Sequence, residues 1–324
     1  MIFHGETSKT PNGEYLFNDS RFTYLGRWDV GANGMVSGWA SSSIEFKVKN
    51  TSSIKIKAYI NRTTTTIIEA IGFHIDLDPN QTSGIAFDSN TGTLLGYRTL
   101  SLPIANDGME HSVILHTLSN TPLDSFNQNT LIYFNSITLD AGGVLLAKPQ
   151  GAKKIQYIGD SWLATSNDWA RLVDETLYSA IQIAGSGYTL SVSDSRYNYD
   201  YTGVLNTSDV AVDAVVISFG VNDYLAGVSI ASFQTSLLSL IDKVRLKQPN
   251  VKIFLVRVLN NGSNLYGQYL TSMNNAAGLR SNVIVVDTTS LDSGSDWVDS
   301  GHLGANSKLA LGALVKTQLL ANGI

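Results

Sequence analysis

The 324-residue chain contains no cysteine. Disulfide bonds, thiol nucleophiles and cysteine zinc sites are therefore excluded, although a chain of this length can bury a core that is stable without disulfides. Charged residues are also scarce, at 15% of the sequence, and the net charge of −5 includes no basic cluster, so we do not expect nucleic acid as a partner. No run of about 18 apolar residues is present, so we expect no membrane span.

The composition and the beginning of the chain bear on where the protein works. Asn, Ser, Thr and Gly replace much of the missing charge, a composition common in extracellular β-rich proteins. The segment Met1-Ile-Phe-His-Gly-Glu6 does not resemble a signal peptide, in which an apolar stretch follows basic residues. We expect an extracellular or surface-exposed protein, with a virion tail and the cytoplasm as open alternatives. The oligomeric state is not predicted.

Residues 1–148 have the pattern of an all-β domain. Apolar and polar residues alternate in Ser43–Lys49 and in Ser53–Tyr59, as in strands with one buried and one exposed face. Turn sequences such as Asn106-Asp-Gly108 separate these and further strand-like segments. Short strands with regularly spaced turns predict a β-sandwich or jelly roll. The further segments are Ala70–Leu77, Thr93–Pro103, His111–Thr117 and Thr130–Asp140.

Residues 149–324 have a different pattern, in which short apolar strands alternate with helical stretches. This alternation predicts a second domain, a three-layer α/β fold with a doubly wound, parallel, five-stranded sheet covered by helices. The predicted strands are Lys154–Gly159, Ser179–Ala184, Ala214–Phe219, Val251–Leu259 and Asn282–Asp287. The predicted helices are Asp168–Leu177, Ile230–Lys247 and Asn306–Ala321.

Polar residues and glycines follow the strands of this second domain, at the sheet edge where parallel α/β folds bind their ligands. We therefore expect four segments to lie close together although they are far apart in the sequence. They are Asp160-Ser161 after the first strand, Gly185-Ser-Gly187 after the second, Asn222-Asp223 after the third, and Asp299 to His302 after the last.

Three of these residues match the needs of a serine hydrolase. The hydroxyl of Ser161 requires a neighbouring base to accept its proton, and His302 is the only histidine of the domain. Asp299, three residues earlier, can accept the other ring N–H and fix the tautomer. Asp292 and Asp296 lie in the same segment and are alternatives for this role.

The same segments contain three candidate donors for an oxyanion hole. They are the backbone N–H groups of Ser161 and Gly185 and the side-chain amide of Asn222. Gly187 is an alternative to Gly185. Asp160 and Asp223 are better explained as structural residues that bond to turn backbones beside the site.

Other chemistries are less consistent with the sequence. There is no Gly-X-Ser-X-Gly elbow, no phosphate loop and no full dinucleotide glycine fingerprint. The second domain has a single glutamate, Glu175, so a glycosidase pair there would need two aspartates. His74, His111 and His116 are too scattered to suggest a metal site, and serine-based hydrolysis needs neither a metal nor a cofactor.

At these residues the chain resembles the SGNH (GDSL-type) hydrolase superfamily. Gly159-Asp160-Ser161 is similar to its nucleophile block, Gly220-Val-Asn222-Asp223 to its Gly-X-Asn-Asp block, and Asp299-Ser-Gly-His302 to its Asp-X-X-His block. Ile183-Ala-Gly185 is the loosest match, to the family's Ile-Ser-Gly, and Leu303 replaces the proline often found after the histidine. The resemblance implies the same catalytic and oxyanion residues as above.

The N-terminal half resembles carbohydrate esterase family 2, in which a β-sandwich precedes an SGNH domain. Tyr24-Leu-Gly26-Arg27 is similar to the Tyr-X-Gly-Arg sequence at the start of that sandwich, and Asp107–Leu115 to a later strand. This resemblance implies a serine esterase that removes acetyl groups from an acetylated carbohydrate through an acetyl-enzyme. It also implies that the sandwich helps to shape the sugar-binding cleft. Some members lack the triad acid, and Asp299 indicates that this chain keeps it.

Two other functions remain open. A lipase, thioesterase or acyltransferase of the same superfamily would use the same residues on another acyl group. A surface or phage tail protein that binds glycans, with or without deacetylase activity, would fit the Asn- and Thr-rich sandwich.

Two groups of aromatic residues also have two interpretations each. Tyr197, Tyr199 and Tyr201 form either a platform for sugar rings or, as we favour, the packing of an irregular segment. A second group could line an acyl pocket or pack in the core or at its rim. Its members are Trp162, Trp297 and Tyr266.

Overall fold

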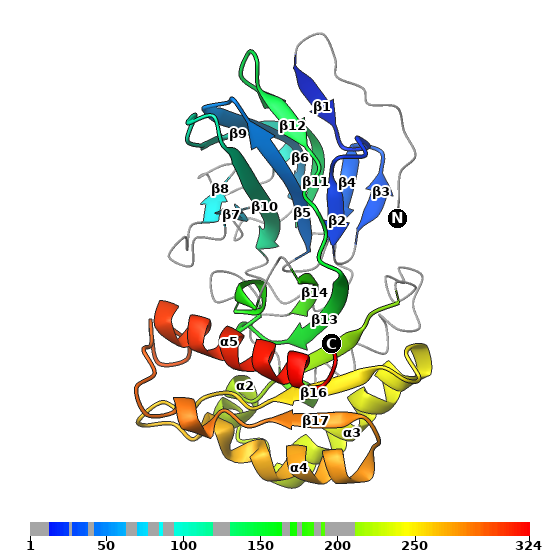
Figure 1. Cartoon of the computed structure of the whole chain (residues 1–324), viewed down its shortest axis with the longest axis vertical. Helices are drawn as coiled ribbons and strands as arrows, with labels where there is room; N and C mark the ends of the chain where they lie inside the picture. The colour runs from blue at the N-terminus through cyan, green and yellow to red at the C-terminus, as the bar shows by residue number, and fades with distance from the viewer. Residues whose placement is uncertain are drawn as a thin grey trace. The chain divides into compact units, whose positions relative to one another are not determined.

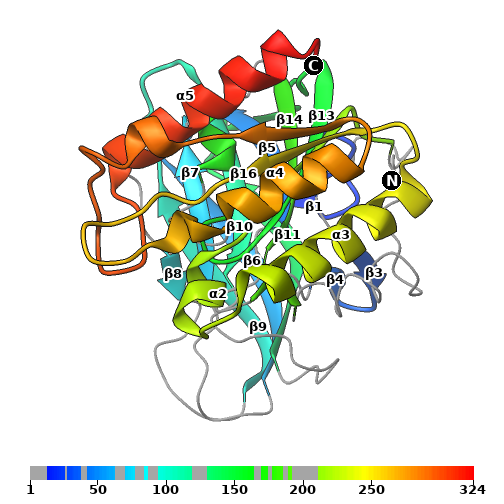
Figure 2. The ribbon, with the colours of Figure 1, turned by 90° about the horizontal axis from the view of Figure 1, so that it is seen from below.

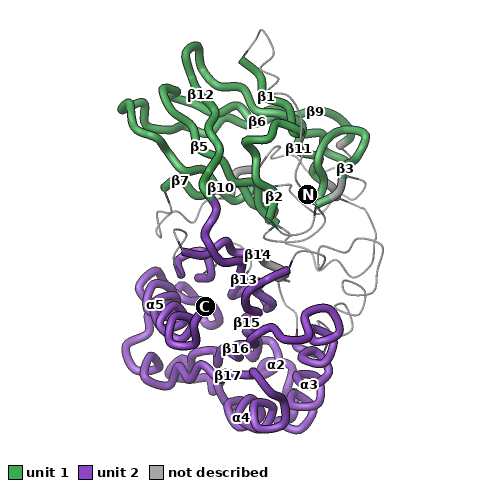
Figure 3. Tube along the Cα trace, turned by 45° about the vertical axis from the view of Figure 1, so that its right-hand side comes forward, with its two compact units in different colours: residues 1–149 green, residues 150–324 purple. Residues whose placement is uncertain are grey.

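The chain divides into two compact units, Met1–Pro149 and Gln150–Ile324, in a computed structural model, and Figure 3 draws them in different colours. The predicted domain boundary, after residue 148, lies one residue before this division. The structure describes residues 13–25, 28–37, 42–62, 70–76, 84–86, 94–118, 130–163, 169–173, 177–184, 189–191 and 211–324.

Within the described residues, the N-terminal unit forms two six-stranded antiparallel sheets. The strands of the first sheet are β1 (Glu14–Leu16), β3 (Asp29–Gly31), β4 (Gly34–Ser37), β6 (Ser53–Arg62), β9 (Leu94–Pro103) and β11 (Thr130–Leu139). Those of the second are β2 (Thr23–Leu25), β5 (Ser43–Lys49), β7 (Ala70–Ile75), β8 (Gly84–Ala86), β10 (Glu110–Leu118) and β12 (Val144–Leu146). The first has the order β3-β4-β11-β6-β9, with β1 beside β11, and the second the order β12-β5-β10-β7-β8, with β2 beside β5 (Figure 1).

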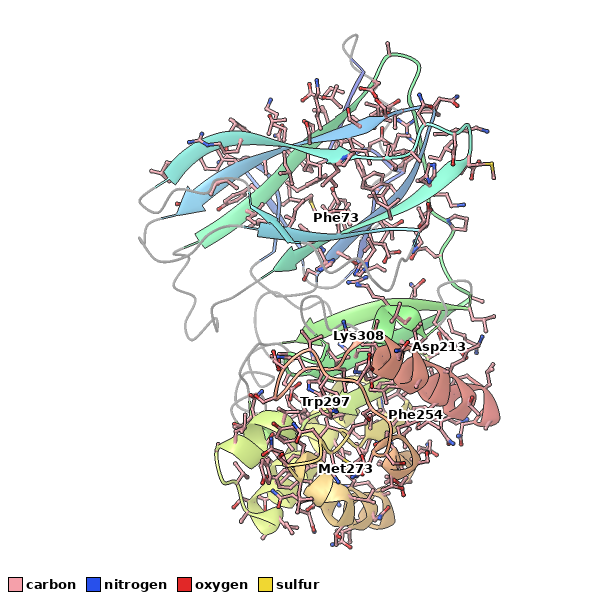
Figure 4. All side chains as sticks on the ribbon, turned by 90° about the vertical axis from the view of Figure 1, so that its left-hand side faces the viewer. Phe73, Asp213, Phe254, Met273, Trp297 and Lys308 are labelled. Atoms are coloured by element: carbon pink, nitrogen blue, oxygen red, sulfur yellow. The ribbon has the colours of Figure 1, made fainter. Side chains whose placement is uncertain are left out.

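The apolar faces of the two sheets share one core. On β6, the alternating residues Ile54, Ile56 and Ile60 are fully buried, as the alternation in the sequence predicts. They belong to one cluster with Phe46 of β5 and Phe73 of β7, which come from the other sheet, and Phe73 is labelled in Figure 4. The N-terminal unit is therefore a β-sandwich, and the all-β prediction for this half is confirmed.

The short strands of the sandwich were not predicted. The six predicted strands correspond to β5, β6, β7, β9, β10 and β11. The strands β1, β2, β3, β4, β8 and β12 have only three or four residues each, which is too few to establish an alternating pattern.

The C-terminal unit contains one five-stranded parallel sheet in the order β14-β13-β15-β16-β17 within the described residues, and this prediction is confirmed. Its strands are β13 (Lys153–Gly159), β14 (Tyr178–Ala184), β15 (Ala214–Ser218), β16 (Lys252–Val256) and β17 (Val283–Val286). The sheet lies between α5 (Ala305–Ala321) on one face and α3 (Ile230–Lys247) with α4 (Leu270–Leu279) on the other, as Figure 2 shows. All five residues of β15 are buried, which explains its continuous apolar sequence.

Helix α3 begins and ends where the sequence predicts. The hydroxyl of Ser229 accepts the N–H of Ser232 at 3.1 Å and caps the first turn, and Gln248 before Pro249 ends the helix. One face packs against the unit through residues spaced three or four apart. They are Phe233, Leu237, Leu240, Ile241 and Val244. No helix among the described residues is long and apolar enough to cross a membrane.

The predicted helix Asp168–Leu177 is wrong where the structure describes it. Only Ala170–Leu172 is helical there, as a short 3-10 turn, and Leu177 lies in the turn that leads into β14. Trp169, Ala170 and Arg171 are buried consecutively, which the single apolar stripe of a surface helix does not allow. Among the α-helices whose bounds the structure describes, two were not predicted, α4 and the five-residue α2 (Val221–Leu225).

A histidine bridges two loops at one end of the sandwich. His111 Nδ1 lies 2.7 Å from Asp76 Oδ2, and its Nε2 lies 3.0 Å from Asp107 Oδ1. The hydrogen bond with Asp76 is the main cause that raises the pKa of His111, and the bond with Asp107 adds to it, while burial acts in the opposite direction. Both ring nitrogens therefore donate in the protonated form.

This arrangement predicts a pH-dependent stability. The folded-state pKa of His111 lies above the unfolded value of about 6.5, so the stabilisation is complete below that pH and is lost as the pH rises through the folded-state pKa. We expect the Tm advantage of the wild type over His111→Gln, a few degrees at about pH 5.5, to shrink by about pH 8.5. Calorimetry across this range measures it, and a constant difference would contradict the assignment.

Candidate active site

Ser161 lies in a tight turn directly after β13. Gly159 ends the strand where no side chain fits, since a Cβ would lie 2.5 Å from both the carbonyl oxygen of Ser218 and Cδ1 of Leu163. The buried carboxylate of Asp160 then accepts the N–H of Trp162 at 3.0 Å. These two constraints fix the backbone on both sides of Ser161, which is itself only 7% exposed.

Asp299 and His302 lie in a short hairpin that precedes α5. Trp297 and Leu303 pair across its base as an isolated antiparallel bridge. The N–H of Val298 donates to the carbonyl of His302 at 2.9 Å, and the N–H of Gly304 donates to the carbonyl of Asp296 at 2.9 Å. We call residues 296–304 the histidine hairpin.

The structure brings Ser161, His302 and Asp299 together in one chain of hydrogen bonds. His302 Nε2 lies 3.2 Å from Ser161 Oγ, and His302 Nδ1 lies 2.8 Å from Asp299 Oδ2 and 3.0 Å from Oδ1. With Nδ1 donating to the carboxylate, the tautomer is the one whose Nε2 can accept the serine proton. The side chains of His302 and Asp299 are 35% and 54% exposed, so the outer part of the site is open to solvent.

Asp299 is held as a carboxylate by the hairpin itself. Its Oδ1 accepts the N–H groups of Gly301 at 2.8 Å and His302 at 2.9 Å. The bond from Gly301, followed by the bond with the His302 ring, lowers the pKa of Asp299 below its usual value. The group that faces the imidazole is therefore negatively charged near neutral pH, which stabilises the ring when it takes up a proton.

The two alternative aspartates have other partners. Asp292 pairs with the buried guanidinium of Arg257 through contacts of 2.9 and 2.7 Å. Asp296 accepts the N–H of Ser307 at 2.6 Å and that of Asn306 at 3.2 Å, and so caps the first turn of α5. Of the three candidates, Asp299 alone contacts the His302 ring among the described residues.

Asn222 lies at the same sheet edge as Ser161, in α2 after β15. The two strands that precede these residues are adjacent and parallel, with Gly159 paired to Ser218. Gly220 introduces α2 with a φ of 146°, and a Cβ there would lie 2.9 Å from Val258 Cγ2, so the turn requires glycine.

Two buried carboxylates anchor the turns beside the site. Asp160 accepts the N–H of Trp162 in the turn of Ser161, and Asp223 accepts the N–H of Leu190 at 2.9 and 3.1 Å. Burial raises the pKa of Asp160 to about 7, with a further contribution from the charge of Asp223, and burial raises the pKa of Asp223 to about 6. Both bond to backbone N–H groups, as expected for structural residues.

Sequence reasoning missed the bonds that hold the histidine hairpin in place. The indole N–H of Trp162 donates to the carbonyl of Gly301 at 2.8 Å. The hydroxyl of Tyr266 and the amide of Asn261 each donate to the carbonyl of Ser300 at 2.6 Å. No local pattern signals such pairs, because the partners are 34 to 139 residues apart.

The aromatic residues around the hairpin pack against one another. Trp162 and Tyr266 are almost fully buried, and their rings lie 5.8 and 6.1 Å from that of Trp297, which Figure 4 labels. For Trp162 and Tyr266, burial supports the packing interpretation over an acyl pocket.

Some predicted residues lie outside the described part of the chain. They are Gly185, Gly187, Tyr197, Tyr199 and Tyr201. The role of Gly185 in an oxyanion hole therefore stays a prediction. The described residues contain no group of three or more His, Asp or Glu side chains arranged to hold a metal ion.

Comparison with known families gives a match to the second unit. Residues 155–306 match the family model of the GDSL-like Lipase/Acylhydrolase family. The C-terminal unit is therefore similar to GDSL-like hydrolase domains, in agreement with the resemblance in the three sequence blocks. No curated protein sequence matches the chain.

Solved structures with the same fold cover nearly the whole chain. An acetyl xylan esterase from the rumen bacterium Butyrivibrio proteoclasticus has a TM-score of 0.70 at 14% identity, over 95% of this chain and 98% of that one. A family two carbohydrate esterase from Clostridium thermocellum, in complex with cellohexaose, has a TM-score of 0.67 at 20% identity, over 93% and 98%. A salicylyl-acyltransferase from a tetracycline biosynthetic pathway has a TM-score of 0.63 at 11% identity, over 96% and 97%.

The chain thus has the two-domain fold of family 2 carbohydrate esterases, and the predicted resemblance is confirmed at the level of fold. The family match and the fold shared with these neighbours are consistent with an esterase or a related hydrolase.

The cap of α5 gives a prediction about stability. Burial raises the pKa of Asp296, but the bonds from Ser307 and Asn306 outweigh it and lower the pKa overall, so the ionised form is stabilised in the folded state. We expect Asp296→Ala to reduce the free energy of unfolding by about 1–2 kcal/mol at neutral pH. The wild-type advantage should be present above about pH 3.9 and be lost as the pH falls further.

Urea denaturation of both proteins measures the effect. Asp287→Ala is the matched control, since Asp287 is exposed and its carboxylate bonds only to the nearby N–H of Thr289, at 2.9 Å, within the described residues. Equal losses in the two variants would contradict a special role for the α5 cap.

Proposed function

We propose that the protein is a serine esterase that removes O-acetyl groups from a carbohydrate. The observation that carries this proposal is the hydrogen-bond chain from Asp299 through His302 to Ser161 at the carboxyl end of a parallel sheet. The two-unit fold shared with an acetyl xylan esterase, and with an esterase in complex with cellohexaose, supports a carbohydrate ester as substrate.

The geometry supports a two-step acyl transfer. Ser161 Oγ attacks the carbonyl carbon of the ester while His302 Nε2 accepts the hydroxyl proton. The tetrahedral intermediate then collapses: the bond to the sugar oxygen breaks, His302 returns the proton to that oxygen, and the acetyl group stays on Ser161. A water molecule then attacks the carbonyl carbon of the acetyl-enzyme while His302 accepts its proton. The bond to Ser161 Oγ breaks, acetate leaves, and His302 returns the proton to Ser161 Oγ.

The oxyanion of each tetrahedral intermediate needs preorganised donors. We assign this role to the backbone N–H of Ser161, the side-chain amide of Asn222 and, as predicted from the sequence, the N–H of Gly185. Each such donor contributes roughly 10²–10³ in rate. The positions of Ser161 and Asn222 after adjacent parallel strands are consistent with this assignment.

The exposure of the triad supports a bulky substrate. His302 and Asp299 are partly open to solvent, and they lie on a hairpin whose Val298 is 69% exposed. An acetyl group carried on a polysaccharide can approach such a site without the chain entering a deep pocket. This is the feature of the described residues that favours a carbohydrate ester over a free fatty-acid ester.

An acyltransferase or a long-chain esterase is the second candidate. The salicylyl-acyltransferase has the same two-unit fold, and the same triad can pass an acyl group to an alcohol instead of water. The acyl-enzyme step is common to both functions, so the acceptor and the acyl chain distinguish them.

Ester hydrolysis tests the proposal directly. We expect the wild type to hydrolyse p-nitrophenyl acetate faster than the octanoate, and to release acetate from at least one of acetylated xylan, acetylated mannan and acetylated bacterial surface glycans. Ser161→Ala should lower kcat by about 10⁴-fold or more, because the nucleophile is lost. Faster octanoate turnover, or undiminished hydrolysis by Ser161→Ala, would contradict the proposal.

The role of Asp299 is tested by an isosteric change. Asp299→Asn removes the charge that sets the His302 tautomer, and kcat should fall by up to about 10⁴-fold. Asp296→Asn, in the same hairpin but directed at α5, should lower kcat by less than about tenfold because it leaves the His302 partner intact. Steady-state kinetics compares them, and a loss under about tenfold for Asp299→Asn would show that another group orients the ring.

A further inference from the structure

Two consecutive residues of the nucleophile turn are bonded to two consecutive residues of the histidine hairpin. Ser161 Oγ lies 3.2 Å from His302 Nε2, and the indole N–H of Trp162 donates to the carbonyl of Gly301 at 2.8 Å. The two contacts join the same pair of segments, 141 and 139 residues apart in the sequence. The hydrogen bond from Trp162 to Gly301 therefore links the two backbone segments that carry Ser161 and His302.

The indole of Trp162 is well suited to fix this separation. The side chain is 0% exposed, and the N–H of the same residue is held by Asp160 Oδ1 at 3.0 Å. Its ring meets that of Trp297 edge to face, with centroids 5.8 Å apart. Asp160 holds Trp162 at its backbone N–H, and the histidine hairpin holds the indole at its ring and at its N–H. The side chain is therefore a rigid spacer between the turn and the hairpin.

The tip of the histidine hairpin depends on such bonds because it is exposed. Leu303 at its base is buried, whereas Val298, Asp299 and Ser300 at its tip are exposed, so packing holds the base and not the tip. Its loop is tied to the unit through two consecutive carbonyls, that of Ser300 to Tyr266 and Asn261, and that of Gly301 to Trp162. Only the bond to Gly301, among these, comes from the segment that carries the nucleophile.

We propose that Trp162 is a positioning residue, which sets the distance between Ser161 and His302 through its hydrogen bond to Gly301. The inference rests on the proposed esterase function for its effect on rate, while the distance itself is a property of the fold. A displacement of about 1 Å between reacting groups can cost about 10²-fold in rate. Loss of the indole N–H should therefore act mainly on kcat.

The chain offers a matched control for a tryptophan-to-phenylalanine change. Trp169 is also 0% exposed, and its ring packs edge to face on Tyr157 at 5.8 Å. In the part of the chain that the structure describes, its indole nitrogen has no hydrogen-bond partner. Trp169→Phe removes the same atoms from the same unit as Trp162→Phe, without breaking a bond to the hairpin.

Kinetics on p-nitrophenyl acetate gives the first readout. We expect Trp162→Phe to lower kcat by about 10- to 100-fold with KM within about twofold, and Trp169→Phe to change both by less than about threefold. A second variant, Trp162→benzothienylalanine, keeps the bicyclic shape and removes only the N–H. It should reproduce the loss in kcat with a Tm close to that of the wild type.

A spectroscopic cycle gives a readout that does not depend on activity. In protein labelled with ¹⁵N-histidine, the Nε2 resonance of His302 should shift on Ser161→Ala, because the hydroxyl 3.2 Å away is removed. We expect this shift to persist in the Trp169→Phe background and to be reduced or lost with Trp162→Phe and with Trp162→benzothienylalanine. A shift that is unchanged in both Trp162 backgrounds overturns the positioning role, whatever the kinetics.

The esterase function and the positioning role of Trp162 can be contradicted independently of each other. If the wild type hydrolyses none of the esters, the proposed function is wrong, and the resonance cycle still decides whether Trp162 sets the Ser161–His302 distance. If hydrolysis requires Ser161 but Trp162→Phe matches Trp169→Phe in kcat and in the resonance, the esterase function stands and the positioning role is wrong.

Discussion

The proposed chemistry of this protein depends on a 3.2 Å contact between Ser161 and His302, which are 141 residues apart in the sequence. Neither residue belongs to a helix or a strand, so regular structure alone cannot hold them together. The parallel sheet brings the two segments to one edge. Turns with tightly constrained backbones then hold the two side chains in contact. Gly159 and Gly220 are required there because any Cβ would collide with neighbouring atoms.

Buried polar groups, rather than packing of the triad itself, provide most of this constraint. Burial raises the pKa of Asp160 and of Asp223 well above that of an exposed aspartate, while the bonds from backbone N–H groups act in the opposite direction. Burying them is unfavourable, but each fixes a turn beside the site. The imidazole of His302 and the carboxylate of Asp299 can then remain partly exposed, which suits the proposed carbohydrate substrate.

Much of this could be predicted from the sequence, and the exceptions have physical reasons. Ser161 and His302 were found because strand ends and short motifs are local signals. Asp299 could not be separated with certainty from Asp292 and Asp296 until their partners were known, because three aspartates in one loop look alike in sequence. The bond from Trp162 to Gly301 has no local signature at all.

The predictions of secondary structure likewise succeeded where the sequence has a local signal and failed where it has none. Long segments with a clear period, such as β6 and α3, were predicted, whereas strands of three or four residues were not. The expected helix from Asp168 to Leu177 failed because the consecutive burial of residues 169–171 overrides local helix propensity. Tertiary packing, which a single sequence does not display, decided each of these cases.

Covalent labelling tests most directly whether the imidazole of His302 activates the hydroxyl of Ser161. A fluorophosphonate reacts with a serine only when its proton is removed by a neighbouring base. We expect one adduct, on the peptide that contains Ser161, and a labelling rate at least about 10³-fold lower in His302→Gln. An adduct on another serine, or equal rates in the two proteins, would contradict it.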